Sequence, residues 1–178
     1  MRLQDKVAVI TGAAQGIGLG IAQRFSKEGA RVMMLDVNED VGARAAEDIS
    51  GARFFCTDVS DKAAVDSTVD EIIADAGRID ICVNNAGILR SGEVLEISEE
   101  DFDKVLSVNL KGAFLMSQAA GRHMVAAGGR LFQHGHGRCR GRLLHPSRPR
   151  GRLLQHGHGG CRGRLFPVSY THLTLPTI

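Results

Sequence analysis

Two kinds of hydrophobic pattern alternate along the first 130 residues of the chain. Short apolar runs are separated by longer stretches in which apolar residues recur every three or four positions. The short runs predict buried strands, and the longer stretches predict helices with one apolar face. The predicted strands cover residues 7–10, 31–35, 53–57 and 79–83.

The helical stretches carry recognisable start and stop signals. Gly29 and Gly77 follow the first and third of them, as a C-terminal glycine does. Ser98 precedes three acidic residues and predicts an N-cap, because a serine hydroxyl accepts a hydrogen bond from the first turn of a helix. The predicted helices begin near Ile17, Glu39, Val65 and Ser98, and a last one covers about residues 108–127.

Strands that alternate with helices predict an α/β fold. The expected architecture is a Rossmann-type, doubly wound parallel sheet with helices on both faces and right-handed crossovers. We expect the sheet to end after the fourth strand and its following helices, since the alternation stops near Gly129. Sheets of this kind bind ligands beyond the carboxyl ends of their strands.

A glycine-rich turn lies at the first of these strand ends. Residues 11–18 read T-G-A-A-Q-G-I-G between the first strand and the first helix. Gly12 permits a tight turn, Gly16 lets a ligand approach the backbone, and Gly18 lets the helix pack on the strand. Free N–H groups and the positive helix end then predict a phosphate or pyrophosphate site.

Asp36 follows the second strand, 18 residues beyond Gly18. A carboxylate there can accept hydrogen bonds from the adenosine ribose and repels a 2′-phosphate, which favours NAD over NADP. Gln15 agrees, because the glycine turn holds no basic side chain that would attract a 2′-phosphate. The alternative is that Asp36 only caps the turn before Glu39.

Charge divides the chain into two unlike parts. Residues 1–129 hold 13 basic and all 20 acidic residues, a balance of −7, whereas the remainder holds nine arginines and no acid. The basic part could contact nucleic acid phosphates, but it has no interleaved aromatic residues and no helical period. We therefore expect no nucleic-acid partner.

The motifs at the strand ends together resemble those of the short-chain dehydrogenase/reductase family. They are T-G-A-A-Q-G-I-G at 11–18, L-D-V at 35–37, D-V at 58–59, N-N-A-G at 84–87 and V-N-L-K-G at 108–112. The match is to the group of 3-oxoacyl-carrier-protein reductases, glucose dehydrogenases and hydroxysteroid dehydrogenases. It implies an NAD(P)-binding domain over residues 1–130, a small carbonyl or secondary alcohol substrate, and a homotetramer or homodimer.

The resemblance also implies roles for individual positions. The pyrophosphate turn would consist of Gly12, Gln15, Gly16, Ile17 and Gly18; Asp36 would hold the ribose; Asp58 and Val59 would bracket the adenine; Asn85, Ala86 and Gly87 would lie beside the nicotinamide ribose. Asn84 would brace the sheet. Asn109 matches a proton-relay asparagine, with the alternative that it satisfies a helix kink. Lys111 is interpreted as a surface lysine.

The catalytic serine, tyrosine and lysine that the resemblance implies are absent. Tyr170 is the only tyrosine, Thr174 stands where the lysine should be, and no lysine follows Lys111. Ser147 lies in H-P-S-R-P, which is not the end of an apolar strand. The family reaction is hydride transfer between nicotinamide and a carbonyl or alcohol, with tyrosine as general acid/base. We expect this chain to be inactive, and a non-catalytic NAD-binding protein is the alternative.

The composition of the segment after residue 130 is unlike that of a folded domain. Residues 131–143 recur at 153–165 with 11 of 13 identical, and each copy carries an H-x-H-x-x-C sequence. That spacing fits no closed zinc pattern, so we expect no metal site. Arginine, glycine and histidine dominate when GC-rich DNA is translated out of frame, so residues 131–167 are interpreted as a disordered, out-of-frame tail. Residues 168–178 resemble a translated sequencing adapter.

The expected location is the cytoplasm. The N-terminus does not resemble a signal peptide, and no apolar run has the length needed to span a membrane. Cys56 and Cys82 lie in apolar, strand-like segments and are expected to be buried, reduced thiols.

Overall fold

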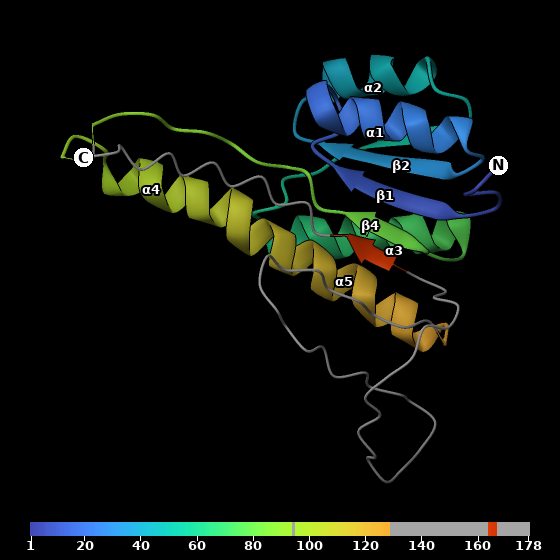
Figure 1. The fold of residues 1–178 in the computed structure, drawn as a ribbon. Coiled ribbons are helices and arrows are strands. Elements are labelled where there is room, and N and C mark those ends of the chain that lie inside the picture. Colours follow the sequence, from blue (N-terminus) through green and yellow to red (C-terminus); the bar gives the residue numbers. More distant parts are fainter. Residues whose placement is uncertain (94, 129–163, 167–178) are drawn as a thin grey trace, which may run out of the picture.

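A parallel β-sheet with helices on both faces forms the centre of the structure (Figure 1). The computed structural model describes residues 1–93, 95–128 and 164–166. The elements are β1 (Val7–Thr11), α1 (Gly16–Lys27), β2 (Arg31–Asp36), α2 (Glu39–Glu47), β3 (Ala52–Cys56), α3 (Lys62–Ala76), β4 (Ile81–Val83), α4 (Glu99–Leu106), the π-helix η1 (Ser107–Gly112), α5 (Ala113–Ala126) and β5 (Arg164–Phe166).

The strand order confirms the predicted fold class. The order is β3-β2-β1-β4-β5, and every neighbouring pair is parallel. The chain begins at the central strand, builds one half of the sheet outward to β3, and then crosses to β4 on the other side of β1. The direction of winding therefore changes between β1 and β4, where such sheets form ligand crevices.

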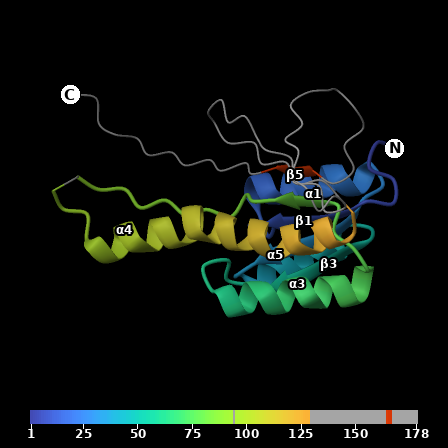
Figure 2. The ribbon, with the colours of Figure 1, turned by 90° about the horizontal axis from the view of Figure 1, so that it is seen from below.

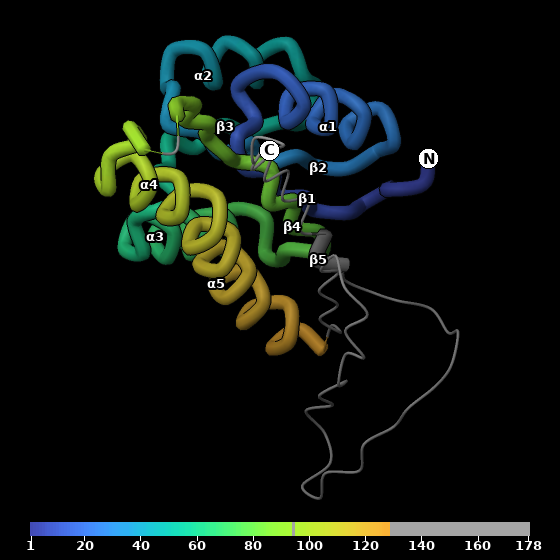
Figure 3. Tube along the Cα trace, turned by 60° about the vertical axis from the view of Figure 1, so that its left-hand side comes forward, coloured from blue at the N-terminus to red at the C-terminus, as the bar shows by residue number. Residues whose placement is uncertain are grey.

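Successive side chains of a strand point to opposite faces of the sheet, and this alternation produces two hydrophobic cores. Val7 and Val9 of β1 pack with buried residues of α3 and α5. Ala8 and Ile10 face the opposite way and pack with buried residues of α1 and α2. Figure 3 shows α1 and α2 on one side of the sheet and α3, α4 and α5 on the other. β1, β2 and β4 consist mainly of buried apolar residues, as predicted for strands that are covered on both faces.

The sheet continues one strand further than the sequence analysis expects. Residues 164–166, inside the segment interpreted as a tail, form β5 and pair with β4 in parallel, with Cys82 opposite Leu165. This corrects the expectation that the sheet ends at β4. The open edge of β4 presents backbone N–H and C=O groups that a short extended segment can satisfy whatever its sequence pattern. The other residues of the tail lie outside the described part of the chain.

The long helical region contains a π-helical segment that hydrophobic periodicity does not reveal. The predicted helix over residues 108–127 consists of the π-helix η1 followed by α5. In Figure 2, α4 and α5 form one continuous helical rod through this segment. Ser98 caps α4 as predicted, since the Asp101 N–H donates to the Ser98 Oγ at 3.1 Å.

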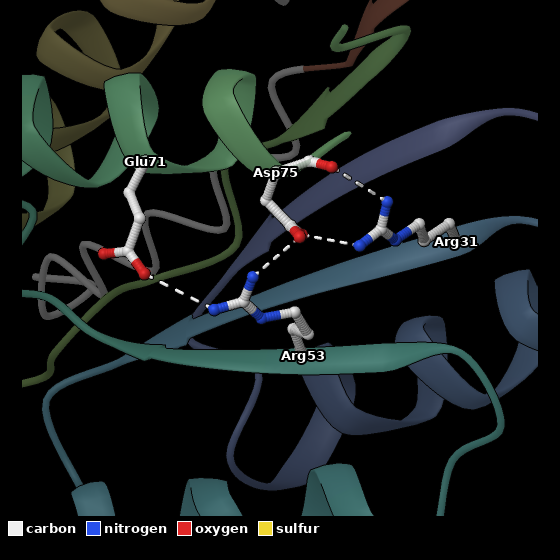
Figure 4. Close-up of polar contacts among 4 residues, drawn as sticks. All are labelled: Arg31, Arg53, Glu71 and Asp75. Carbon is white, nitrogen blue, oxygen red and sulfur yellow. Dashed lines mark hydrogen bonds and ion pairs between the residues drawn. The ribbon is translucent and has the colours of Figure 1, made fainter. Parts of the chain in front are cut away.

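A charged network fixes α3 to the sheet (Figure 4). The Asp75 carboxylate accepts from Arg31 of β2 at 2.6 Å and from Arg53 of β3 at 2.9 Å, and Arg53 also pairs with Glu71 at 3.4 Å. Desolvation raises the pKa of Asp75, but the bonds from Arg53 and Arg31 outweigh it and hold that pKa below its ordinary value. Two neighbouring strands are thereby tied to one helix.

Cys56 is exposed, which corrects the prediction that both cysteines are buried. Cys56 is the last residue of β3, which is the outermost strand on that side of the sheet among the described residues. Cys82 lies in β4, between β1 and β5, and is buried as predicted, and burial raises the pKa of its thiol to about 12. In the described part of the chain, no helix is both long and apolar enough to cross a membrane.

Candidate functional site

A cleft of about 640 Å³ lies at the carboxyl ends of the strands, where the winding direction changes. It brings together most residues that the sequence marks as a site. Its lining consists of Gly12, Gln15, Ile17, Asp36, Val37, Asn38, Thr57, Asp58, Val59, Asn85, Ala86, Gly87, Ile88, Lys104 and Val108. Six of these residues had no individual site role assigned from the sequence: Val37, Asn38, Thr57, Ile88, Lys104 and Val108.

Two glycines of the turn have backbone angles that favour glycine. Gly12 and Gly16 have φ angles of +64° and +58°, which L side chains rarely adopt. A Cβ on Gly18 would lie 2.0 Å from the carbonyl oxygen of Gly12, so the first turn of α1 packs directly on the loop. Gly16 and Gly18 thus shape the loop without lining the cleft.

The start of α1 is suited to an anion. Gln15 occupies the N-cap position with extended backbone and makes no side-chain capping bond. The first turn carries no acidic residue. Its backbone N–H groups are therefore not capped by Gln15, and the helix dipole adds partial positive charge at the same place.

The side chain of Asn85 holds the glycine turn in place. Its Nδ2 donates to the carbonyl oxygens of Thr11 at 3.1 Å and Gly12 at 3.0 Å. Asn85, Ala86 and Gly87 all line the cleft. Asn84 is buried, and its Nδ2 donates to the Oγ of Ser117 on α5 at 2.9 Å, so this side chain braces the sheet against a helix.

Thr11 joins the two strands on either side of the switch point, which the sequence analysis did not foresee. Its buried hydroxyl accepts from the backbone N–H groups of Asn85 and Ala86, each at 3.0 Å, and donates to the Val83 carbonyl at 3.4 Å. A threonine at the end of a buried strand, directly before the glycine turn, was the available signal. This hydroxyl fixes the end of β4 beside the turn.

Asp36 is placed by the glycine turn and by its own loop. Its Oδ2 accepts from the Ala14 N–H at 3.0 Å, and its Oδ1 accepts from the Asn38 N–H at 3.1 Å. A carboxylate oxygen has two lone pairs, so each oxygen can still accept a further bond. Asp36 therefore fixes the loop and also presents acceptors to the cleft.

Asp58 and Val59 form the floor of the cleft after β3. The Asp58 Oδ1 accepts from the hydroxyl of Ser60 at 2.7 Å and from its N–H at 2.8 Å. The Ser60 hydroxyl bond is the main reason that the pKa of Asp58 lies below its ordinary value, and the charges of Lys104 and Lys111 act in the same direction. Asp58 is consequently ionised at neutral pH.

Asn109 lies in the π-helix and uses both ends of its amide on one partner. Its Oδ1 accepts from the Ile88 N–H at 2.8 Å, and its Nδ2 donates to the Ile88 carbonyl at 2.9 Å. The side chain therefore holds the segment after β4 against η1. The alternative role for Asn109 is to satisfy polar backbone groups at a helix kink. Asn109 does bond to backbone groups, but they belong to Ile88 in the loop after β4 and not to the helix.

The strand order and the cleft at the switch point place this domain in the Rossmann class of α/β proteins. The short chain dehydrogenase family model matches residues 6–133. The D-threitol dehydrogenase of Mycolicibacterium smegmatis is 45% identical over 132 residues, which are 72% of this chain and 51% of that protein. The chain belongs to the short-chain dehydrogenase family, and it spans about half the length of the curated relatives it matches.

Solved structures agree with this family and differ in their cofactors. An NAD⁺-bound xylitol dehydrogenase superposes with a TM-score of 0.71 at 33% identity, over 75% of this chain and 53% of the other. An NADP complex of a short-chain dehydrogenase from Burkholderia cenocepacia has a TM-score of 0.66 at 36% identity, over 69% and 52% of the two chains. The narrower resemblance to 3-oxoacyl-carrier-protein reductases stays a prediction.

Proposed function

We propose that the domain binds NAD(H) as the cofactor half of a dehydrogenase that acts on a secondary alcohol or carbonyl. The observation that carries the proposal is the position of Asp36. Its carboxylate lines the cleft and is tied through Ala14 to the turn before α1. A phosphate on the ribose would meet this fixed negative charge, whereas free ribose hydroxyls would meet acceptors.

The shape of the cleft supports the same assignment. The pyrophosphate would lie on the backbone of the glycine turn, the adenine would lie between Val37 and the Asp58–Val59 floor, and the nicotinamide end would follow the backbone of residues 85–87. When bound, the nicotinamide ring accepts or donates the hydride. The proposed task of the chain's own residues is to bind and orient that group.

For the complete enzyme we propose a polyol substrate. The relatives described above are named D-threitol dehydrogenase and xylitol dehydrogenase. The present chain has no Y-x-x-x-K sequence and no lysine after Lys111. It therefore lacks the acid/base group that alcohol oxidation requires, and a non-catalytic NAD-binding protein is the second candidate function.

The binding proposal predicts affinity without turnover. The 178-residue chain should bind NADH at least about tenfold more tightly than NADPH, which corresponds to about 1.4 kcal/mol, and should oxidise neither threitol nor xylitol. Titration of NADH fluorescence measures both affinities, and absorbance of the reduced cofactor reports turnover. Equal affinity for NADH and NADPH would overturn the NAD assignment, and polyol-dependent NADH formation would overturn the expected inactivity.

We propose that residues 131–167 are translated out of frame and that residues 168–178 derive from an adapter. The support is compositional: residues 131–178 hold eight arginines and no acid, and they contain a repeat with 11 of 13 residues identical. Sequencing of the coding DNA across codons 128–178 checks this directly. A correct frame with no family-like alternative reading would contradict it.

We propose the cytoplasm as the location of the protein. The exposed thiol of Cys56 supports this, because free surface cysteines persist in reducing compartments.

We propose assembly with a second copy through an apolar stripe on α4, η1 and α5. Leu106, Leu110 and Phe114 are exposed and recur at a spacing of four residues. Leu110→Glu should shift a dimer or tetramer to monomers, because the substitution places a charge in a desolvated contact. Sedimentation velocity measures the effect, and Val41→Glu, which places the same charge at an exposed apolar position of α2, is the control. An unchanged sedimentation coefficient in Leu110→Glu, together with a multimeric parent chain, would exclude this stripe.

A further inference from the structure

The charges of the cleft do not match its proposed anionic ligand. Among the residues that the structure describes, three ionisable side chains line it: Asp36, Asp58 and Lys104. The turn over residues 12–18 contributes no charged side chain. A dinucleotide with a pyrophosphate group would therefore approach two carboxylates, and Lys104 is the one basic side chain that lines the cleft within the described part of the chain.

Lys104 reaches the cleft from a different element than the two acids do. It belongs to α4, which in Figure 1 lies beyond the carboxyl ends of β1 and β2. The residue is exposed. Within residues 1–93, 95–128 and 164–166 its ammonium group enters no ion pair, whereas Lys62 pairs with Asp66 and Lys6 with Asp80. The charge of Lys104 is thus available to a ligand in the cleft.

We propose that Lys104 is the cation that draws the anionic nucleotide into the cleft and offsets the repulsion from Asp36 and Asp58. The inference rests on the proposed cofactor function and adds the residue that controls cofactor capture. A charge at the mouth of a cleft acts mainly on the association rate, and its effect weakens when salt shortens the Debye length to about 8 Å. Lys104 is therefore a recognition residue, not a catalytic one.

Lys111 provides a matched control. It lies two turns further along the same helical rod, carries the same charge, and also lowers the pKa of Asp58. Lys111 lines a separate depression with Leu106, Leu110 and Phe114, and it does not line the cleft. A general effect of net charge would appear equally in both lysine variants, whereas capture at the cleft requires Lys104 alone.

The experiment compares Lys104→Gln and Lys111→Gln with the parent 178-residue chain. The chain contains no tryptophan, so stopped-flow mixing would follow the fluorescence of NADH itself. At low ionic strength, Lys104→Gln should slow NADH association about three- to tenfold, and the difference should vanish at about 0.5 M salt. Lys111→Gln should change the rate by less than about twofold.

Equilibrium binding of ADP and adenosine distinguishes attraction of Lys104 to the phosphates from a direct contact of Lys104 with the adenine base. In competition with NADH, ADP should lose affinity in Lys104→Gln, and uncharged adenosine should not. Equal losses for ADP and adenosine, equal effects of the two lysine variants, or no effect of Lys104→Gln would each overturn the inference. ADP binding that depends on Lys104, with equal affinity for NADH and NADPH, would support Lys104 while overturning the NAD assignment. A parent chain that binds neither NADH nor ADP would overturn both.

Discussion

Gly18→Ala should abolish NADH binding and destabilise the domain. A Cβ at this position would lie 2.0 Å from the Gly12 carbonyl oxygen and 2.6 Å from the Asn85 Nδ2. The nearest atom belongs to the backbone, so the conflict is relieved only if α1 moves away from the turn. Overpacking of this kind costs about 3 kcal/mol, the upper end of its usual range. The same movement would displace the N–H groups that we assign to the pyrophosphate.

Gly20→Ala is the control for this prediction. Gly20 lies two residues further along the same helix, on a different face, and a Cβ there would meet no atom within 4 Å. Alanine favours the helix over glycine, so this variant should gain about 0.5–1 kcal/mol. Urea unfolding followed by circular dichroism measures both free energies, and NADH titration measures binding. Parent-like affinity and stability in Gly18→Ala would contradict the assigned packing.

Asp36→Ala should lower NADH affinity about 100-fold. The substitution removes the acceptor for the Ala14 and Asn38 N–H groups as well as the proposed ribose contact. Hydrogen bonds to charged groups are worth about 1.5–3 kcal/mol each, and 1.4 kcal/mol corresponds to a factor of ten in affinity. Asp36→Asn keeps one carbonyl acceptor and removes the charge, so it should lose less NADH affinity and bind NADPH relatively better.

Asp40→Ala tests whether these effects reflect charge alone. Asp40 is an exposed acid in the first turn of α2, close to Asp36 in sequence but outside the cleft lining. Its removal should cost about 0.3–1 kcal/mol of stability through the helix dipole and leave the NADH to NADPH ratio unchanged. Parallel titrations of both nucleotides give this ratio. An unchanged ratio in Asp36→Asn would show that Asp36 does not select the cofactor.

The sequence predicted the fold well because its determinants are local. Buried parallel strands read as apolar runs, glycines end helices, and a serine before acidic residues caps one. Each of these signals lies within a few residues of the element that it specifies. The observed strand order then follows from the preference for right-handed crossovers and from the position of β1 at the centre.

Other features were missed or misplaced because their causes lie far apart along the chain. Cys56 reads as a core residue, yet it ends the outermost strand on its side of the sheet. The π-helix around Asn109 follows no hydrophobic period, and Asn109 bonds to Ile88, 21 positions earlier. β5 forms because the edge of β4 accepts extended backbone, which no pattern in residues 164–166 announces.

By itself, the sequence determined the fold class, the glycine turn and the acid at the end of β2, because local backbone preferences and strand periodicity are written in neighbouring residues. Tertiary structure alone decided how those residues act together. It made Asn85 and Thr11 the supports of the glycine turn, connected Asp36 to Ala14, and placed Lys104 in the same cleft as two carboxylates. The physical reason is that a hydrogen bond or charge interaction depends on distance in space, and the folded sheet alone brings these strand ends and α4 together.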